Sequence, residues 1–214
     1  MSDLRIQQQA RGMRIIHGAE AHRRRVIVGD LARQARTAGF DEIVLPSVEP
    51  AGLYSDKAGP EVLGQMYTFQ DRGDRTLCLR PEGTATCQAL ARELWSQQRD
   101  VKLFYEARCY RYERPQAGRY REFLQFGVEW LWPSADPMQE LLALAESMVR
   151  GVCRDRVEVH TSVKRGLAYY TGPGFEIARP ALGAQKQVCG GGVYAEGCGF
   201  ALGVDRLLQE VDDG

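Results

Sequence analysis

Apolar side chains recur every three to four positions over residues 20–38, which predicts an amphipathic helix that ends at Gly39. The same kind of pattern predicts further helices over residues 84–95, 136–150 and 200–211. Pro137, near the start of the helix predicted over residues 136–150, suits the first helical position, because a residue there has no helical partner for its N–H and proline has no N–H to leave unpaired. The rest of the chain shows the shorter patterns that are typical of strands and turns.

Short apolar or alternating runs bounded by turn residues predict several strands. They lie at residues 40–45, 66–69, 76–79, 101–112, 122–131, 157–160 and 175–178. Residues 54–64 are polar and rich in turn formers, which predicts a surface loop. Because helices are mixed with hairpins and do not alternate one by one with strands, we expect an α+β fold. Its mixed, mainly antiparallel sheet is flanked by helices.

The chain has 214 residues, a mass of 24.0 kDa, and 28 basic and 28 acidic side chains. This length predicts one domain over residues 1–214, with a core that needs no disulfide or metal. Zero net charge excludes a polycation that coats nucleic acid, but it is compatible with a local basic patch. No apolar run is long enough to span a membrane, and the N-terminus is not a secretory signal, so we expect a cytoplasmic protein.

Cysteine and histidine positions argue against a metal site. The six cysteines include no C-x-x-C pair, and the three histidines are scattered along the chain. Structural zinc sites need closely spaced ligands. We therefore predict free thiols and no metal centre.

The hairpin over residues 104–129 carries the densest polar chemistry. Because side chains alternate along a strand, Arg111 and Glu113 are expected on one face, a cation beside a carboxylate. Phe123, Gln125 and Glu129 share a face of the returning strand and suit a polar small molecule with a flat ring. The alternative is a solvated hairpin with cross-strand ion pairs, which contribute little to stability.

Glu82 and Thr84 lie in the run Arg-Pro-Glu-Gly-Thr, between a predicted strand and the start of a predicted helix. Free N–H groups at such a helix start suit a bound zwitterion or anion. The alternative is that these side chains only cap the helix, with Thr84 as the cap.

Two later stretches add further candidates. Arg165 precedes Tyr169 and Tyr170, which form either the wall of a site or part of a packed core. Three consecutive glycines before Tyr194 allow a ligand or another chain to approach the backbone closely. Arg206, in the last predicted helix, is either within reach of a phosphate or an ordinary surface arginine.

Taken together and in this order, these segments resemble the catalytic domain of class II aminoacyl-tRNA synthetases, and among them the histidyl-tRNA synthetase family. Residues 20–46 are similar to motif 1, residues 110–129 to motif 2 and residues 200–207 to motif 3. Residues 165–176 resemble the histidine-specific signature, and their combination with Arg-Pro-Glu-Gly-Thr makes the match specific. The resemblance covers nearly the whole chain and implies the class II catalytic fold in a homodimer.

The resemblance also implies a chemistry and a role for each position. It implies that ATP activates an amino acid as an aminoacyl adenylate, with histidine as the expected substrate, and that Mg²⁺ accompanies the nucleotide without a protein cage of its own. The implied catalytic cations at the α-phosphate are Arg111 and Arg165. The implied ATP-binding residues are Arg111, Glu113, Phe123 and Arg206. The implied amino-acid-binding residues are Glu82, Thr84, Gln125, Glu129, Tyr169, Tyr170 and Tyr194.

Three residues depart from the family's pattern. Ala168 and Ala195 stand where the family has acidic residues, and Val193 stands where it has arginine. These departures leave the side-chain specificity open. The stretch between motif 2 and Arg165 is too short for the family's insertion domain, and the sequence ends after motif 3, so we expect no anticodon-binding domain.

Two functions are compatible with this resemblance. The first is an adenylating ligase whose acceptor is a carrier protein or a small amine. A tRNA acceptor is less favoured, because tRNA affinity depends on phosphate neutralisation and the net charge here is zero. The alternative is a non-catalytic, histidine-binding regulatory subunit like that of ATP phosphoribosyltransferase, which has no need of Arg165.

Overall fold

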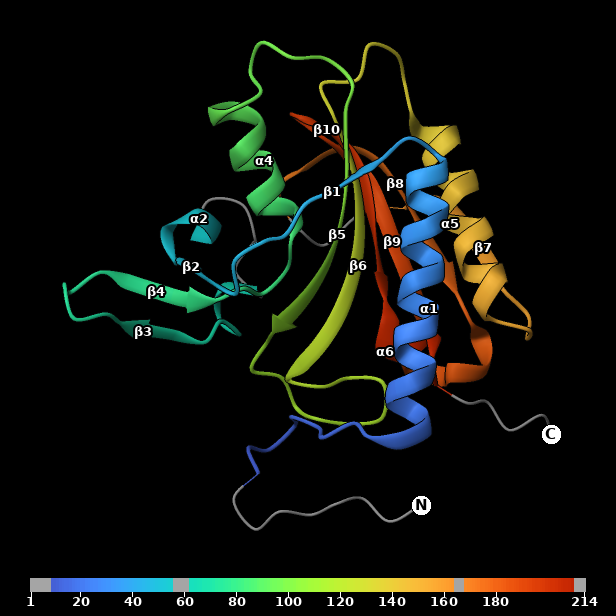
Figure 1. Ribbon diagram of the computed structural model, residues 1–214, viewed down its shortest axis with the longest axis horizontal. Coiled ribbons are helices and arrows are strands. Elements are labelled where there is room, and N and C mark those ends of the chain that lie inside the picture. Colours follow the sequence, from blue (N-terminus) through green and yellow to red (C-terminus); the bar gives the residue numbers. More distant parts are fainter. Residues whose placement is uncertain (1–8, 56–61, 164–167, 210–214) are drawn as a thin grey trace.

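A curved seven-stranded sheet occupies the centre of the molecule, with strand order β1-β5-β6-β10-β9-β8-β7 (Figure 1). The computed structural model describes residues 9–55, 62–163 and 168–209. The strands are β1 (Asp41–Glu42), β5 (Val101–Tyr110), β6 (Glu122–Leu131), β7 (Glu158–Val163), β8 (Tyr170–Ala178), β9 (Gln187–Tyr194) and β10 (Gly197–Gly203). Strand β1 runs parallel to β5, and the other neighbouring pairs are antiparallel. The expected α+β class with a mainly antiparallel sheet is confirmed.

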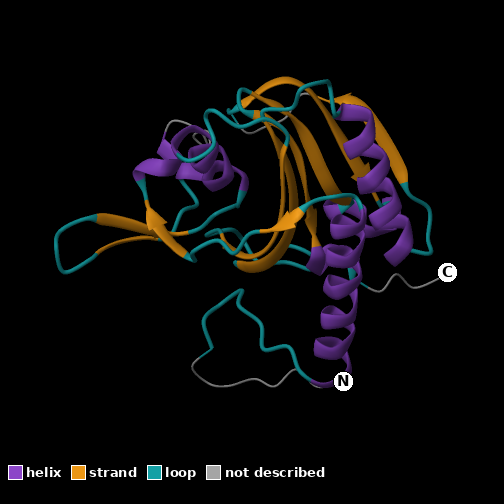
Figure 2. Cartoon of the chain, turned by 45° about the horizontal axis from the view of Figure 1, so that its top comes forward, coloured by secondary structure: helices purple, strands orange, loops and turns teal. Residues whose placement is uncertain are grey.

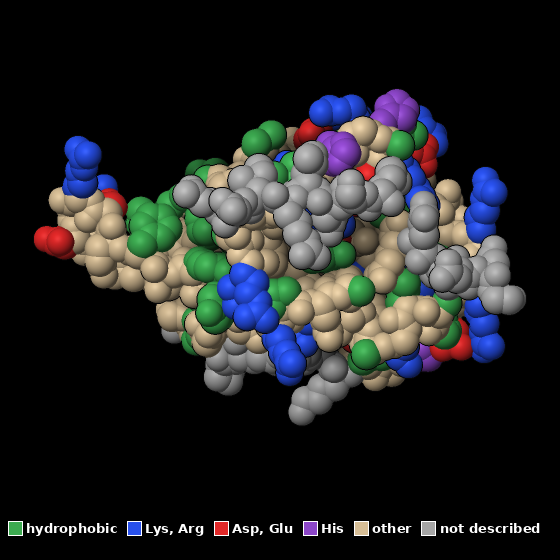
Figure 3. All heavy atoms as spheres, turned by 90° about the horizontal axis from the view of Figure 1, so that it is seen from below, with side chains coloured by type: hydrophobic (Ala, Val, Ile, Leu, Met, Phe, Trp, Pro, Cys, Tyr) green, Lys and Arg blue, Asp and Glu red, His purple; other side chains and the backbone are tan. Residues whose placement is uncertain are grey.

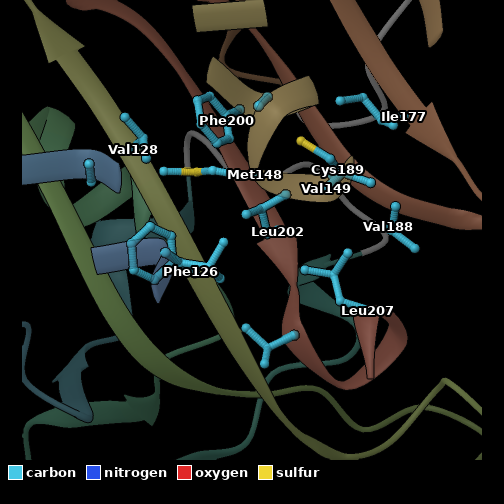
Figure 4. Packing of buried hydrophobic residues seen from close by; sticks show 14 of the residues in the cluster. Phe126, Val128, Met148, Val149, Ile177, Val188, Cys189, Phe200, Leu202 and Leu207 are labelled. Carbon is cyan, nitrogen blue, oxygen red and sulfur yellow. The ribbon is translucent and has the colours of Figure 1, made fainter. Parts of the chain in front are cut away.

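Helices α1 (Gly18–Thr37) and α5 (Met138–Val152) cover one face of this sheet (Figure 2). Helix α1 ends near Gly39, whose φ of +82° lies in the left-handed region that glycine tolerates, as the sequence predicted. The main core lies beneath these two helices (Figure 4). Its sheet side includes Phe104, Phe126, Val128, Phe200 and Leu202, and its helix side includes Leu31, Ala35, Leu141, Met148 and Val149. We call this the packed face of the sheet.

The opposite side of the sheet carries a smaller layer (Figure 2). It consists of α2 (Gly52–Ser55), α4 (Thr84–Glu93) and a three-stranded sheet in the order β2-β4-β3. The small sheet is built from β2 (Val48–Pro50), β3 (Thr68–Gln70) and β4 (Thr76–Leu79), and its β3–β4 hairpin projects away from the rest of the molecule (Figure 1). The chain ends in a short 3₁₀ helix, η1 (Pro180–Gln185), then β9, β10 and the single turn α6 (Val204–Leu207).

The prediction of a helix over residues 200–211 is wrong. Residues up to Gly203 belong to β10, which lies between β6 and β9. Phe200 and Leu202 alternate onto the packed face while Gly199 and Ala201 face the other way, so the period is that of a strand. Helix α6 begins only at Val204 and spans one turn.

Two smaller predictions also need correction. The surface loop expected at residues 54–64 begins inside α2, where Tyr54 is fully buried and donates a hydrogen bond to Glu49. Residues 56–61 lie outside the described part of the chain. The strand expected at residues 40–45 is only two residues long, because the chain leaves the sheet edge before Pro46. Among the described residues, no helix is both long and apolar enough to cross a membrane.

Candidate active site

The face of the large sheet opposite the packed face has a floor made of residues with little or no side chain. This site floor consists of Gly127 on β6, Gly199 and Ala201 on β10, and Gly190 and Gly192 on β9. These residues are neighbours across the strands, in the pairs Gly127–Ala201, Ala201–Gly190 and Gly199–Gly192. Such a floor leaves the backbone open to close approach by a ligand or by the side chains around it.

Glu129 lies at one end of the site floor and is completely buried. Its two carboxylate oxygens accept hydrogen bonds from Thr84 Oγ1 at 2.7 Å and Tyr194 Oη at 2.6 Å. Burial raises the pKa of this carboxyl to about 8, against the lowering effect of the neighbouring hydroxyls of Thr84, Tyr194 and Tyr105. Opposite it on β10 stands Gly199, where a Cβ would collide with the Glu129 carboxylate. The missing side chain at Gly199 is therefore what makes room for the carboxyl.

Glu82 lies just before α4, two residues ahead of Thr84, which bonds Glu129. Its carboxylate accepts hydrogen bonds from the backbone N–H groups of Thr84 at 2.7 Å and Ala85 at 2.9 Å. Burial raises its pKa, while these two donors and the Arg111 cation lower it. The cap of α4 is thus supplied by Glu82, and the expectation that Thr84 caps the helix is wrong because Thr84 is already its first helical residue. The Thr84 hydroxyl is free to bond Glu129 instead.

Three tyrosines form an aromatic wall beside Glu129. The ring centroids of Tyr169 and Tyr170 are 4.6 Å apart, and those of Tyr169 and Tyr194 are 6.1 Å apart. Tyr169 and Tyr194 are buried and Tyr170 is half-buried. These residues are part of a hydrophobic cluster with Leu103 and Leu131 and are also next to the site floor. The two interpretations of this stretch, site wall and packed core, therefore describe the same side chains.

Arg111 follows directly after β5. Its Nε donates a hydrogen bond to the carbonyl of Pro81 at 2.9 Å, and its guanidinium carbon lies 5.4 Å from the centroid of the Phe123 ring. This contact is of the cation–π type. Gln125, two residues further along β6, accepts a hydrogen bond from the Cys109 thiol at 3.3 Å. The amide NH₂ of Gln125 is the end that is left for a ligand.

Glu113 does not lie beside Arg111 on a strand face, contrary to expectation. Strand β5 ends at Tyr110, so Glu113 belongs to the connection between β5 and β6. Its carboxylate accepts a hydrogen bond from Arg119, across the tip of that connection. The ion-pair alternative for this hairpin is therefore correct at Glu113.

Arg206 is half-buried and its donors are in use. They bond the carbonyls of Gly118 and Gln187 and the side chain of Gln185, each at 2.8 Å. Burial lowers the pKa of the guanidinium. Arg206 thus links the tip of the β5–β6 connection to the start of β9, and it is not the isolated surface arginine of the alternative interpretation.

Asp205, next to Arg206, fixes the position of α6. Its carboxylate accepts hydrogen bonds from Arg14 and Arg24, both at 2.9 Å, and from the backbone N–H of Leu124 at 2.7 Å. These bonds connect α1 and the segment before it to β6 and α6. The position of α6, and with it that of Arg206, therefore depends on Arg14 and Arg24, which lie near the other end of the sequence.

The remaining candidates are Arg165 and the three residues that depart from the family's pattern. Arg165 falls within residues 164–167, which lie outside the described residues. Ala168 and Ala195 are exposed. Val193 packs against Gly172: a Cβ added at Gly172 would lie 3.0 Å from the Cβ of Val193. In the described part of the chain, no three His, Cys, Asp or Glu side chains are grouped so that they could hold a metal ion.

Tyr105 is a site residue that the sequence interpretation missed. It lies on β5 directly opposite Gly127, and its ring occupies the space where Gly83 and Gly127 have no side chain. The signal was available, because alternation places Tyr105, Cys109 and Arg111 on one side of the predicted strand.

Comparison with known proteins connects this geometry to one family. A family model described as histidyl-tRNA synthetase matches residues 12–135. Histidine–tRNA ligase from Methanosarcina acetivorans is 29% identical over 93% of this chain and 74% of its own length. That alignment runs over 306 positions, more than the 214 residues of this chain, so the relative carries internal residues that are missing here. Histidine–tRNA ligase from Methanosphaerula palustris is 34% identical over 94% of this chain and 50% of its own length.

Solved structures show the same relationship. The apo histidyl-tRNA synthetase of S. aureus superposes with a TM-score of 0.78 at 26% identity, covering 94% of this chain and 69% of its own. A Bacillus halodurans protein described as an ATP phosphoribosyltransferase regulatory subunit/histidyl-tRNA synthetase gives a TM-score of 0.78 at 17% identity, over 100% of this chain and 85% of its own. At that identity the second likeness concerns the fold alone. The expected class II synthetase fold is confirmed.

Proposed function

Because the chain belongs to the histidyl-tRNA synthetase family, we propose that it activates an amino acid with ATP and forms an aminoacyl adenylate. An oxygen of the amino acid's carboxylate attacks the α-phosphorus of ATP, the bond to the β-phosphate oxygen breaks, and pyrophosphate leaves. The observation that carries the proposal is the buried Glu129, held by Thr84 and Tyr194 at the end of a floor without side chains. A buried carboxyl with prepared partners suits recognition of a polar substrate.

We propose histidine as the amino acid. An imidazole has two ring nitrogens, which complement a carboxyl and a tyrosine hydroxyl. Glu129, with Tyr169, Tyr170 and Tyr194 around it, would receive this ring. Glu82, Thr84 and Gln125 would receive the ammonium and backbone groups at the start of α4.

On the ATP side, Arg111 would stabilise the negative charge that develops at the α-phosphate, since a fixed cation does so without reorganising. Phe123, which already contacts Arg111, would stack on the adenine, and Glu113 and Arg206 would flank it. In this arrangement Arg206 exchanges some of its present carbonyl partners for the nucleotide. Mg²⁺ would arrive on the phosphates of ATP, because the described residues offer no metal-binding cluster.

Arg165 would be the second catalytic cation. Arg165→Ala should retain amino acid binding and lose most of the adenylation rate. A normal exchange rate in that variant would contradict the assignment.

We propose that the activated amino acid passes to a carrier protein or small amine and not to tRNA. The net charge is zero, and the internal residues found in full-length relatives are missing. On the face drawn in Figure 3, Lys and Arg side chains are scattered and do not form one stripe. Tight binding of tRNA(His) in a filter assay, weakened steeply by salt, would overturn this choice.

We also propose a homodimer formed through α1 and the neighbouring strands. Large apolar side chains are exposed there, with Val44 86% exposed and Val26 55% exposed. Light scattering at micromolar concentration should give twice the mass of the chain, and Val44→Lys should reduce it to the monomer mass.

The direct test of the proposed function is amino-acid-dependent ATP–pyrophosphate exchange with all twenty amino acids and no acceptor. Histidine should support exchange, and Arg111→Ala should abolish it. Arg108→Ala is the matched control, because Arg108 is a nearby arginine on β5 that pairs with Glu122 at the surface. Absence of exchange with every amino acid would refute adenylation.

A second candidate is a histidine-binding regulatory subunit. The bonds that engage each of the three side-chain nitrogens of Arg206 favour it, because they hold this arginine on protein partners and away from a nucleotide. Absence of exchange together with a histidine-dependent rise in melting temperature would select this function over the first.

A further inference from the structure

Glu49 on β2 is a further buried carboxyl next to the candidate site, and the proposed function gives it no part. Only 3% of the residue is exposed. Burial raises the pKa of this carboxyl, while the hydroxyls of Tyr54 and Thr86 and the Arg80 cation lower it. A buried carboxyl is costly to the fold, and groups of this kind gather at functional sites. Its place beside the site therefore calls for an explanation.

The Glu49 carboxylate ties three elements together. It accepts hydrogen bonds from Tyr54 Oη on α2 and from Thr86 Oγ1 on α4, the second at 2.8 Å. Tyr54 Oη also lies 3.2 Å from the carbonyl oxygen of Glu82. Both oxygens of the Glu49 carboxylate are thus engaged, and they hold β2 and α2 against the first turn of α4.

The first turn of α4 is held from two opposite sides. Residues two apart on a helix point in nearly opposite directions, because each residue advances the helix by about 100°. Thr84 donates to Glu129 on the large sheet at 2.7 Å. Thr86 donates to Glu49 on the small sheet at 2.8 Å. The bond to Glu49 is therefore the counterpart, on the back of the helix, of the bond to Glu129 inside the site.

The turn that is held in this way sets the position of the Glu82 carboxylate. This carboxylate accepts hydrogen bonds from the backbone N–H groups of Thr84 and Ala85, so its orientation follows the first turn of α4. A carboxylate has about four acceptor positions, and these two bonds leave others for a cation. A shift of the turn would move those positions away from a bound ammonium group.

We propose that Glu49 is a positioning residue for the ammonium group of the bound amino acid. Its bonds to Tyr54 and Thr86 fix the first turn of α4, and that turn fixes the Glu82 carboxylate. The inference rests on the proposed function, because it takes Glu82 as the group that receives the ammonium. Loss of Glu49 should therefore weaken only those ligands that carry an ammonium group, whereas a merely structural role would affect all ligands alike.

The experiment measures dissociation constants by calorimetry for three ligands with the same imidazole ring. L-histidine has both an ammonium and a carboxylate, L-histidinol has the ammonium alone, and 3-(imidazol-4-yl)propanoate has the carboxylate alone. The variants are Glu49→Ala and Thr86→Val, of which the second keeps the shape of the side chain and removes only its hydroxyl. Thr86→Ser is the matched control, because it restores the hydroxyl at the same position. Melting temperatures without ligand report on the fold.

In Glu49→Ala we expect the affinities for histidine and histidinol to fall about tenfold, and in Thr86→Val about fivefold, the effect of one lost buried hydrogen bond. The affinity for the propanoate should stay within about twofold in both variants. Thr86→Ser should bring the affinity for histidine back to within about twofold of that of the unaltered protein. If Glu49→Ala does not fold, Thr86→Val and Thr86→Ser carry the comparison.

Unchanged affinity for histidine in Thr86→Val, with or without a lower melting temperature, would overturn the inference and leave the proposed function intact. An equal loss for all three ligands would overturn it as well, because the effect would not act through the ammonium group. If the unaltered protein binds none of the three ligands, the substrate assignment fails and this inference fails with it. The expected selective loss in a protein that shows no exchange would support the inference and refute adenylation.

Discussion

The two faces of the seven-stranded sheet use the same strands for opposite purposes. On the packed face, Phe104, Phe126 and Phe200 fill the space under α1 and α5. On the other face, Gly127 and Gly199 leave space that polar side chains enter. The first face stabilises the fold, since burial of apolar area is the dominant favourable contribution. The second face lowers the stability of the fold, because it buries the carboxyls of Glu82 and Glu129. Their raised pKa values reflect the cost of burying the charged form. The packed face thus supports a site that costs stability.

Phe126→Ala should produce the largest loss of stability, about 3–5 kcal/mol, because it opens a cavity in the packed face. Phe123→Ala is its counterpart, three residues earlier on β6 and half-buried on the site side. It should cost less stability and should raise the KM for ATP. Urea unfolding and exchange kinetics measure the two effects. Equal losses of stability in the two variants would contradict the division between the faces.

Gly199→Ala should cost about 1–3 kcal/mol, because the new methyl group would meet the Glu129 carboxylate and the strand cannot move aside. Gly151→Ala, in helix α5, is the control, because a Cβ there would meet only the end of the Gln34 side chain, at an ordinary contact distance of 3.6 Å. It should be neutral or stabilising by about 0.5–1 kcal/mol. The comparison requires only urea unfolding, and a neutral Gly199→Ala would show that the floor tolerates side chains.

Glu129 should make stability depend on pH. Its pKa is near 4.5 in the unfolded chain and about 8 in the fold, so between these values the fold retains a proton that the unfolded chain has lost. Stability therefore falls as pH rises through this window, by at most about 1.4 kcal/mol per pH unit for one group. Glu129→Gln should remove this part of the slope, measured by urea unfolding from pH 5 to pH 8. If Glu129→Gln and the exposed control Glu106→Gln have the same profile as the unaltered protein, Glu129 is ionised in the fold.

The smallest expected effect concerns Cys109, whose thiol holds the carbonyl end of the Gln125 amide. Cys109→Ala should raise the KM for the amino acid about threefold in the exchange assay, since the amide loses one weak orienting bond. Cys153→Ala removes a buried thiol from the packed face and should leave KM unchanged. Identical KM values in the two variants would remove Cys109 from the site.

Local pattern was sufficient where an element is long and strongly periodic. The helix expected at residues 20–38 and the hairpin expected at residues 101–131 closely match α1 and β5–β6. Strand β10 was mistaken for a helix, because a short glycine-rich strand shows its period only when its two neighbours are known. The order of strands in the sheet is likewise a matter of long-range pairing, which no local pattern encodes.

The sequence predicted which residues belong to the candidate site better than it predicted which of them form hydrogen bonds with one another. The sequence singled out Glu82, Thr84, Glu129 and Tyr194, and the structure places them in one hydrogen-bonded group. It could not show that Glu113 would pair with Arg119, since that depends on where β5 ends. The roles of all these residues toward substrates stay predictions until exchange and binding are measured.

The pairing of Glu129 with Gly199 has a consequence for how the protein is made. Strands β5 and β6 are consecutive in the chain and can pair as a hairpin before α5, β7, β8, β9 and β10 have been synthesised. Until β10 arrives, one edge of β6 is unpaired and its buried glutamate lacks a neighbouring strand, a state prone to wrong pairing. A separately expressed segment containing residues 136–214 should therefore be able to dock onto one containing residues 1–135 and complete the sheet from two separate chains.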